Sequence, residues 1–379
     1  MGPLRGVRIV ELAGIGPAPF CGMLLADLGA EVVLVDRKGG SLPFDAKPKH
    51  DITRRGKRSI AVDLKKPGAA ELVLRLIETA DGLLEGFRPG VMERLGLGPD
   101  VCLARNPRLV YGRLTGWGQS GPLAQSAGHD INYVALSGLL YHGGHRGSPP
   151  SIPPTVVGDI GGGAMFMALG LVSAILRARE TGQGQVIDGA ITDGCAVMSS
   201  LIQGLRAQRL WADRRQSNVL DGGAHWYDCY ECADGEWISV GALEPQFYRL
   251  LLEKCGLSGE GLEDAQFDFA NWPRLKERLA GVFRGKTRAE WCELLEGTDV
   301  CFAPVLNLAE AQAHPHNVAR QAYLDVAGVR QPAPAPRFSA TPAEIRSPPA
   351  GIGAHSAELL RSVGYGDEEI ATLAGAGIV

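Results

Sequence analysis

Long apolar runs and an excess of basic residues are both missing from this chain of 379 residues. The longest apolar run, residues 164–176, is too short to span a bilayer, so we expect a buried helix there and no membrane partner. The net charge is −4, which argues against a general nucleic-acid binder. No secretory signal is recognisable, and we expect a cytoplasmic protein.

Paired cysteine motifs are also scarce. The eight cysteines are scattered, which is typical of free thiols in a reducing compartment. Cys229 and Cys232 have a CxxC spacing but lack a second cysteine pair, and they lie in an alternating run over residues 226–240 with a turn at 233–235. This pattern favours a β-hairpin over a redox or zinc site, and we expect no metal.

The first part of the chain alternates strand and helix, which predicts a parallel sheet covered by helices. The predicted strands are residues 7–12, 31–35, 82–84 and 109–111, and the predicted helices are 20–28 and 69–79.

The second half predicts a smaller α+β unit. A hairpin is followed by helices over 273–283 and 288–295, and the proline-rich stretch 331–350 reads as an extended connector. Two last helical segments, 354–363 and 367–374, could return to the first domain.

The first strand-to-helix turn invites comparison with a dinucleotide site, because Gly14 and Gly16 follow a strand and Asp36 ends the next one. Pro17 and Pro19 remove amide donors from the turn that would hold the pyrophosphate, so NAD binding is disfavoured. A tight turn without a ligand and a turn lining a substrate pocket both stay open.

Residues 47–66 hold eight basic side chains against two acidic ones. A basic patch inside an acidic protein suits a small polyanion such as coenzyme A, and a solvated loop is the alternative. Arg37, Arg88 and Arg94 are further candidates for phosphate contacts.

Three acid–base residues stand in short motifs: His129 in Gly-His-Asp, Asp159 shortly before three glycines, and Glu244 before a proline. Taken singly they indicate a structural hydrogen bond, a helix cap and a helix start. Together they are what a two-base proton-transfer site needs, since one base removes a proton, another returns it and a third group orients the first.

The chain resembles the α-methylacyl-CoA racemases, within the superfamily of family III CoA-transferases. The resemblance runs nearly end to end, and the order and spacing of its motifs make it specific. Besides the motifs of His129 and Asp159, the matching segments are residues 6–14, 25–30, 62–65, 87–92, 116–122, 220–224 and 241–248.

This resemblance implies an α/β fold class with a Rossmann-like, CoA-binding large domain from residues 1–190 and 332–379. A small α+β domain would span 226–312, reached through linkers at 191–225 and 313–331. It also implies an interlocked homodimer, with each active site between the large domain of one chain and the small domain of the other.

The resemblance further implies residue roles. His129 and Asp159 would be the bases flanking the substrate α-carbon, Glu244 of the other chain would orient His129, and the backbone N–H of Asp130 would bind the thioester oxygen. The residues implied to hold the CoA ester are Arg37, Val62, Asp63, Leu64, Lys65, Arg88, Arg94, Gly128, Ile131, Asn132 and Tyr133.

The implied reaction is inversion at C2 of a 2-methylacyl-CoA through an enolate, without a cofactor, because CoA is part of the substrate. Glycines 161–163 would let the enolate pass close to the backbone. Met165 and Met167 would form an adaptable apolar floor or a helix core. His225 and Trp226 replace the residues usual in relatives, so the acyl preference could differ if they line the pocket.

Two rivals remain. In a CoA-transferase, Asp159 would act as a nucleophile that forms an acyl anhydride. The His129 loop and the Glu-Pro-Gln-Phe-Tyr motif favour the racemase. A non-catalytic CoA-binding protein is disfavoured because His129, Asp159 and Glu244 are all present.

Overall fold

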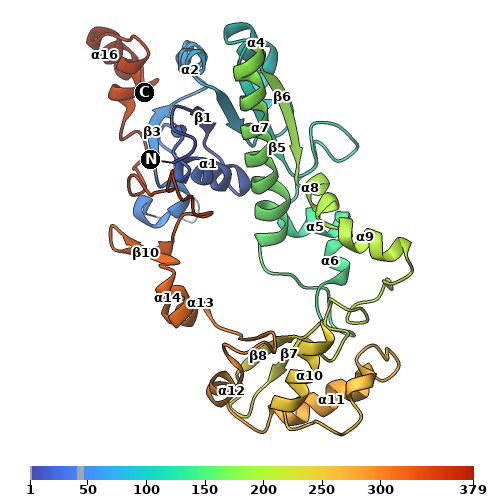
Figure 1. The fold of residues 1–379 in the computed structure, drawn as a ribbon. Helices are drawn as coiled ribbons and strands as arrows, with labels where there is room; N and C mark the ends of the chain where they lie inside the picture. Colours follow the sequence, from blue (N-terminus) through green and yellow to red (C-terminus); the bar gives the residue numbers. More distant parts are fainter. Residues whose placement is uncertain (1, 41–46) are drawn as a thin grey trace. The chain divides into compact units, whose positions relative to one another are not determined.

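The computed structural model describes residues 2–40 and 47–379, and its chain forms two compact units (Figure 1). Unit 1 comprises Met1–Ser137, Pro153–Met198 and Gln321–Val379. Unit 2 comprises Gly138–Ile152 and Ser199–Arg320. The chain therefore enters unit 2 twice, and both of its ends belong to unit 1.

Unit 1 is built on a six-stranded parallel sheet in the order β3-β2-β1-β4-β5-β6. The strands are β1 (Arg8–Leu12), β2 (Glu31–Arg37), β3 (Lys57–Val62), β4 (Gly82–Glu85), β5 (Val110–Thr115) and β6 (Gln185–Ala190). This order confirms the predicted Rossmann-like α/β class, and such sheets bind ligands at their carboxyl edge, where the strand order reverses. The sequence did not reveal β3, which begins with charged residues, or β6, which is half exposed at the sheet edge.

The helices of unit 1 come from both the N-terminal and the C-terminal parts of the chain. They are α1 (Pro17–Asp27), α2 (Ala69–Glu78), α3 (Val91–Arg94), α4 (Pro99–Arg105), α5 (Asp130–Ser137), the π-helix η4 (Val156–Met165), α7 (Phe166–Thr181), α8 (Ile191–Met198), α15 (Ser356–Ser362) and α16 (Asp367–Gly375). Two short 3₁₀ helices, η2 (Pro48–His50) and η3 (Ile52–Arg54), and a hairpin of β10 (Tyr323–Val326) and β11 (Val329–Pro332) complete the unit.

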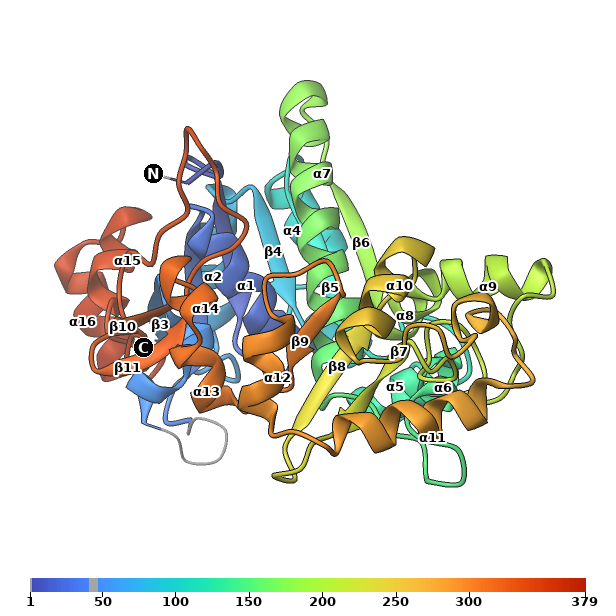
Figure 2. The same cartoon turned by 60° about the horizontal axis from the view of Figure 1, so that its bottom comes forward.

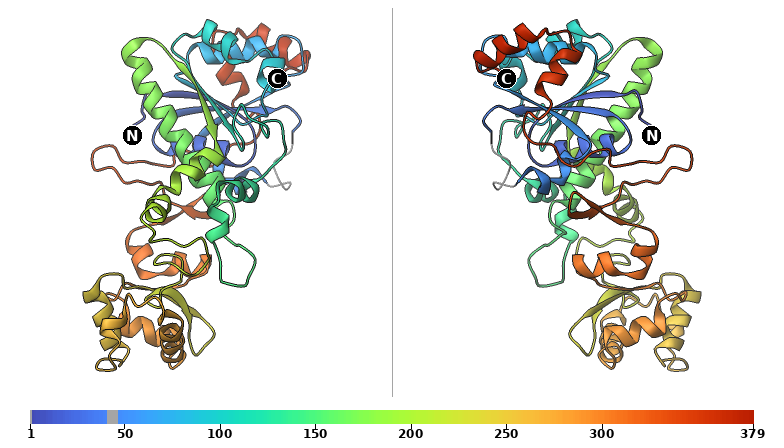
Figure 3. Two further views of the ribbon diagram at one scale, coloured as in Figure 1. Left: turned by 90° about the vertical axis from the view of Figure 1, so that its right-hand side faces the viewer. Right: turned by 90° about the vertical axis from the view of Figure 1, so that its left-hand side faces the viewer.

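The C-terminal segment packs into the core of unit 1. Leu359, Leu360 and Ile378 are buried with side chains of α2 and the central strands. The backbone N–H of His355 donates to the Ser59 carbonyl at 2.9 Å, and that of Asp63 donates to the Ile378 carbonyl at 2.8 Å. Both views of Figure 3 show the red C-terminal helices beside light-blue α2. The return suggested by the sequence is confirmed.

The apolar helix α7 runs alongside β5 and β6 (Figure 2). Met167 and Leu171 are buried against the sheet, whereas Leu169 and Leu176 are about two-thirds exposed, at 66% and 64%. The predicted helix is confirmed. The prediction that it is buried is wrong for the side that carries Leu169 and Leu176. Together with η4 it forms one stretch, Val156–Thr181, that passes a length-and-composition test for a membrane span, as core helices of folded domains also do.

Unit 2 contains a three-stranded antiparallel sheet of β7 (Tyr227–Glu231), β8 (Trp237–Gly241) and β9 (Phe302–Pro304). The predicted hairpin at the CxxC segment is confirmed, and both of its cysteines are free thiols. The helices of the unit are α6 (Leu139–His142), α9 (Ser200–Ala207), α10 (Pro245–Lys254), η5 (Glu263–Ala265), α11 (Trp272–Phe283), α12 (Arg288–Leu295), α13 (Leu308–Ala313) and α14 (Pro315–Ala319).

His225 and Trp226 lie in the core of unit 2 rather than on a pocket surface. Trp226 is completely buried and His225 is 1% exposed. The His225 Nε2 atom lies 2.7 Å from the Tyr248 hydroxyl, and burial, followed by the charge of Lys276, lowers the pKa of His225 to about 4. The imidazole is therefore neutral at pH 7, and these two residues belong to the buried interior of unit 2.

Half of the basic side chains in the segment 47–66, namely Arg54, Arg55, Lys57 and Arg58, pair with carboxylates inside unit 1. Arg54 forms two hydrogen bonds with the Asp36 carboxylate, at 2.9 and 2.6 Å, and Arg55 pairs with Asp27 at 2.6 Å. Arg58, nearer the surface, contacts Glu31 and Glu358, both at 2.8 Å. These three arginines hold strands and connections together through their carboxylate partners.

Lys57 of β3 and Glu11 of β1 form a buried ion pair between the two strands that flank β2. The Lys57 Nζ atom lies 2.6 and 2.8 Å from the two Glu11 carboxylate oxygens and donates to the Pro19 carbonyl at 2.9 Å. Burial raises the pKa of Glu11 to about 7, although the nearby Lys57 charge lowers it. Gly22 has no side chain here because a Cβ would overlap the Glu11 carboxylate.

We expect Lys57→Met to lower the stability of unit 1 by about 3 kcal/mol or more, because it leaves a carboxylate buried without its partner. Urea unfolding at pH 7.5 measures this. The double variant Glu11→Leu/Lys57→Met should recover part of the loss. Arg105→Met is the control, since Arg105 pairs with Glu71 and Glu78 at the surface and should leave the midpoint unchanged. Equal effects of Lys57→Met and Arg105→Met would contradict the assignment.

The neutral His225 should make the stability of unit 2 depend on pH. Its pKa is about 4 in the folded chain against 6.5 in an unfolded one, so the unfolded state binds more protons between these values. The free energy of unfolding should thus fall as the pH drops from 6.5 to 4, by up to about 3 kcal/mol. His225→Gln should flatten this part of the curve, as followed by urea titrations at several pH values. An unchanged slope would show that His225 does not carry it.

Candidate active site

His129 lies immediately before α5, in the loop that follows the carboxyl end of β5. The backbone N–H of His129 donates to Asn132 Oδ1 at 3.0 Å, and the N–H of Asn132 donates to the His129 carbonyl at 2.8 Å. This reciprocal pair fixes the start of the helix and leaves the His129 side chain exposed. Asn132, expected at the CoA ester, therefore has a clear structural function here.

Asp159 lies in the first turn of the π-helix η4, a rare form of helix that is frequent at functional sites. Its backbone N–H donates to Asp130 Oδ1 at 2.7 Å, so two segments about thirty residues apart meet at this bond. Gly158 is required here, because a Cβ would lie 2.5 Å from the same Asp130 oxygen.

Asp130 has two separate functions in this arrangement. Its side chain anchors Asp159, which the sequence did not suggest. Its backbone N–H belongs to the first residue of α5, where helix N–H groups have no acceptor within the helix. Such a donor can stabilise a negative oxygen, which agrees with the expected thioester contact.

The carboxyl of Asp159 has an environment that favours its protonated form. Burial raises its pKa most, and the charge of Asp130 raises it further, against the lowering effects of the Thr155 hydrogen bond and of the His129 charge. Thr155 donates its hydroxyl to Asp159 Oδ2 at 3.1 Å from a left-handed backbone with φ of 57°. Thr155 was missed from the sequence, where nothing marks such a conformation.

Tyr133 and Arg88 complete the surroundings of the two acid–base residues. Burial, then the charge of Asp159, raises the pKa of Tyr133, and the charge of Arg88 lowers it. The Tyr133 ring meets Trp117 edge-on with centroids 4.7 Å apart, and its hydroxyl donates to the Gly128 carbonyl. Trp117 lies in the matching segment 116–122 but was not predicted as a site residue, and its buried indole N–H has no hydrogen-bond partner among residues 2–40 and 47–379.

The glycines after Asp159 allow close packing of η4 against α8. A Cβ at Gly162 would lie 2.6 Å from the Cys195 sulfur of α8, and a Cβ at Gly194 would overlap the Gly162 carbonyl. Met167 is buried against the sheet and Met165 is half exposed, so only Met165 is available as an apolar surface.

The first turn of the chain lies beside Asp159. A Cβ at Gly16 would be 3.1 Å from Asp159 Oδ2. The turn therefore packs against the Asp159 carboxylate. Asp36 is occupied by Arg54 and by the Ser59 hydroxyl, at 2.5 Å, so it is unavailable for a ribose.

The residues expected to bind CoA gather at the carboxyl edge of the sheet only in part. Arg37 ends β2 opposite Val62 of β3, and Arg88 follows β4. The Val62 side chain is buried and Leu64 packs against the core, so these two can offer only backbone atoms. Ile131 is 57% exposed. Within the described ranges, Arg37, Lys65, Arg88 and Arg94 show no ion pair with a carboxylate.

Glu244 belongs to unit 2, as the residue before α10. Its carbonyl accepts a hydrogen bond from the N–H of Tyr248 at 3.0 Å. Its exposed side chain makes no capping hydrogen bond to the described residues of α10. The sequence thus placed a helix start correctly. Residues 2–40 and 47–379 contain no cluster of His, Cys, Asp or Glu arranged for a metal ion.

The geometry of unit 1 therefore offers two neighbouring acid–base side chains, a helix N–H at the start of α5 and, at the carboxyl edge of the sheet, Arg37 and Arg88, which have no carboxylate partner among residues 2–40 and 47–379. This set can move a proton at a carbon next to a carbonyl while holding an anionic substrate.

Comparisons with known proteins agree with this arrangement. The chain is 47% identical over 374 residues to the alpha-methylacyl-CoA racemase of Mus musculus, covering 98% of this chain and 96% of that protein. It is 45% identical over 376 residues to the Homo sapiens racemase, covering 97% and 95%. A solved CaiB/BaiF family protein from Brucella suis has a TM-score of 0.82 and 27% identity, covering 96% of this chain and 99% of that one.

The model of one protein family, described as CoA-transferase family III, matches residues 4–356. This match covers most of the chain, and the chain therefore belongs to CoA-transferase family III.

Proposed function

We propose that the protein is an isomerase that interconverts the 2R and 2S forms of 2-methylacyl-CoA thioesters. The observation that carries this is the pairing of His129 with an Asp159 whose pKa is raised, in a chain 45–47% identical to two racemases over nearly its full length. For inversion in one of the two directions, a neutral imidazole is needed to accept the α-proton and a protonated carboxyl is needed to donate a proton to the opposite face.

In the proposed mechanism one base removes the α-proton and the other delivers a proton to the opposite face. The thioester oxygen becomes negative in the enolate, and the N–H of Asp130 at the start of α5 donates to it. Arg37, Lys65, Arg88 and Arg94 hold the phosphates of CoA as charged donors. The reaction needs no cofactor, because both protons move through side chains of the chain.

We also propose that the active protein is a homodimer in which Glu244 of one copy orients His129 of the other. Exposed apolar side chains on α5, η4, α7 and α8 support this association, because these elements pack on one another and monomers rarely expose large apolar patches. They are Ile131, Leu136, Val156, Met165, Phe166, Leu169, Leu176, Val197 and Met198.

A CoA-transferase is the second candidate, because the family includes enzymes of that description. Asp159 would then attack the thioester carbonyl as a carboxylate. Its raised pKa disfavours this, since burial and the Asp130 charge reduce the ionised fraction. The racemase also gives His129 a function that nucleophilic attack by Asp159 would not need.

The proposal is tested by proton NMR of the purified protein with an enantiopure 2-methylacyl-CoA in D₂O, without any acceptor carboxylate. We expect loss of the α-proton signal and of optical purity. His129→Ala and Asp159→Asn should each slow inversion by about 10²–10⁴-fold, because each removes one of two acid–base groups. His316→Ala, on the exposed side of α14, serves as the control.

Two results would reject the racemase. One is the absence of exchange combined with CoA transfer once a carboxylic acid is added and a mass increase at Asp159. The other is inversion that survives unchanged in His129→Ala.

The neighbours of Asp159 should shift its pKa in opposite directions. Asp130→Asn removes a negative charge while keeping an oxygen that can accept the Asp159 N–H, so the pKa should fall. Thr155→Val removes the hydroxyl that donates to the carboxylate, so the pKa should rise. The corresponding limb of the kcat/KM profile should move to lower pH in the first variant and to higher pH in the second. Shifts of the same sign would contradict this account.

A further inference from the structure

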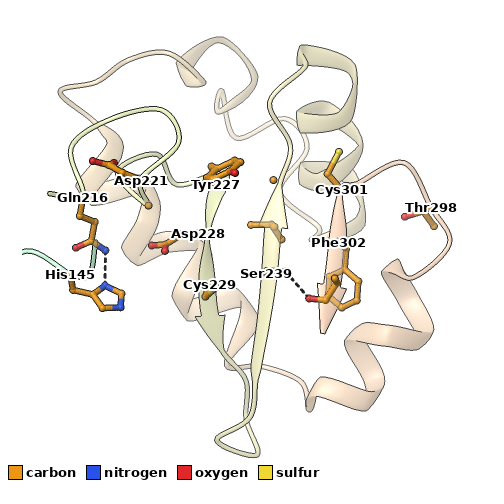
Figure 4. A pocket seen from close by; sticks show the side chains of 15 residues that line it. His145, Gln216, Asp221, Tyr227, Asp228, Cys229, Ser239, Thr298, Cys301 and Phe302 are labelled. Carbon is orange, nitrogen blue, oxygen red and sulfur yellow. Dashed lines mark hydrogen bonds between the residues drawn. The ribbon is translucent and has the colours of Figure 1, made fainter. Parts of the chain in front are cut away.

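The loop that carries Glu244 leaves the sheet of unit 2 at the end of β8. Gly241, the last residue of this strand, pairs with Tyr227 of β7, and its N–H donates to the Cys301 carbonyl at 2.9 Å. Tyr227 and Cys301 lie on the two sides of this strand end in Figure 4. Residues 242–244 continue beyond the strand and are paired with neither β7 nor β9, so their position depends on other groups.

A buried glutamine contacts this loop from the interior of unit 2. Gln266 follows η5 and is only 4% exposed. Its side-chain amide nitrogen donates to the carbonyls of Ala242 and Leu243, at 3.1 and 2.8 Å. An amide nitrogen carries two N–H groups, so both bonds can form at once. The two carbonyls belong to the residues that immediately precede Glu244.

Gln266 is itself held by two tryptophans of the core. Its backbone carbonyl accepts the indole N–H groups of Trp226 and Trp272, both at 2.8 Å, and the two rings meet edge-on with centroids 6.1 Å apart. A carbonyl oxygen has two lone pairs and can accept both bonds. The Trp226 carbonyl in turn accepts the N–H of Ala242 at 2.9 Å. Ala242 is therefore held at both of its backbone polar groups by this one cluster.

The side chain of Glu244 contrasts with the backbone that carries it. The carbonyl of Glu244 accepts the N–H of Tyr248 at 3.0 Å, so α10 fixes the backbone on the other side of the residue. The side chain is exposed and makes no capping hydrogen bond to α10. A carboxylate on a fixed backbone is restricted to a few staggered rotamers, so the backbone decides where it can reach.

We propose that Gln266 is a positioning residue of the reaction, which sets the place of the Glu244 carboxylate through the carbonyls of Ala242 and Leu243. This inference rests on the proposed function, in which Glu244 orients His129, and adds to it a residue that touches neither base. Supporting hydrogen bonds of this kind hold a functional group in its productive geometry. Their loss should lower the rate of the chemical step more than it weakens substrate binding.

The substitution Gln266→Met keeps a side chain of similar length and removes both donors. We expect kcat for α-proton exchange to fall by about 10- to 100-fold, because a shift of about 1 Å in a positioned group has an effect of this order. KM should stay within about twofold of the wild-type value. The matched control is Trp291→Phe, which removes another buried hydrogen bond of unit 2, from the indole N–H to the Phe283 carbonyl of α11 at 2.8 Å. This control should leave kcat unchanged.

A double variant shows whether Gln266 acts through Glu244. Effects of two residues that act through one interaction are not additive. Gln266→Met combined with Glu244→Gln should therefore be no slower than Glu244→Gln alone. Losses in kcat that multiply in the double variant would mean that Gln266 acts on the reaction by another route, and the inference would be wrong.

Hydrogen exchange followed by mass spectrometry gives a readout that does not depend on activity. The full-length Gln266→Met variant should exchange the amides of Gly241, Ala242 and Leu243 at least about tenfold faster than the wild-type protein, because opening of this loop becomes easier. Trp291→Phe should leave these amides unchanged. Equal exchange of the loop in Gln266→Met and in the wild-type protein would overturn the inference.

The outcomes separate the two proposals. If the wild-type protein exchanges no α-proton with any 2-methylacyl-CoA, the proposed function fails, and hydrogen exchange still decides whether Gln266 fixes the loop. If exchange occurs and Glu244→Gln is as fast as the wild-type protein, the orienting role of Glu244 fails, and the catalytic role of Gln266 fails with it. If Glu244→Gln is slow and Gln266→Met is as fast as the wild-type protein, only the role of Gln266 is rejected.

Discussion

The candidate site depends on one hydrogen bond, from the backbone N–H of Asp159 to the carboxylate of Asp130. It joins the start of α5 to the first turn of η4, and it brings the two acid–base residues together because His129 immediately precedes Asp130. The bond is possible only where Gly158 leaves space for the Asp130 oxygen. The same carboxylate raises the pKa of Asp159, so one side chain controls both the position and the protonation of its neighbour.

Three buried ion pairs stabilise the part of unit 1 that carries this edge of the sheet. Lys57 with Glu11, Arg54 with Asp36, and Arg55 with Asp27 connect the first three strands, α1 and the returning C-terminal segment. An isolated ion would be costly in such a core, but paired and fully hydrogen-bonded ions are tolerated and restrict how the elements can fit together. The α1 helix held in this way begins beside Asp159, so the core arrangement contributes to the geometry of the site.

The two units have different chemical characters. Unit 1 carries acid–base groups, a helix N–H and cations at a parallel-sheet edge, which suit a charged substrate undergoing proton transfer. Unit 2 carries Glu244, before α10, and an antiparallel sheet that packs on its own apolar core. Since one fold can host several reactions, membership of CoA-transferase family III leaves the chemistry to the individual residues, among them an Asp159 whose pKa is raised by burial and by the Asp130 charge.

The sequence by itself determined the α/β class, the central strands β1, β2, β4 and β5, the hairpin at the CxxC segment and the identity of His129, Asp130, Asp159 and Glu244 as candidates. These features follow from local periodicity, turn residues and ordered motifs. Tertiary structure decided what the sequence could not: that Arg54, Arg55 and Lys57 are buried in ion pairs, that the glycines serve helix packing, that His225 is a neutral core residue, and that Thr155 contacts Asp159. Each of these depends on partners distant along the chain or on a backbone conformation, and neither burial nor φ is encoded in local residue type.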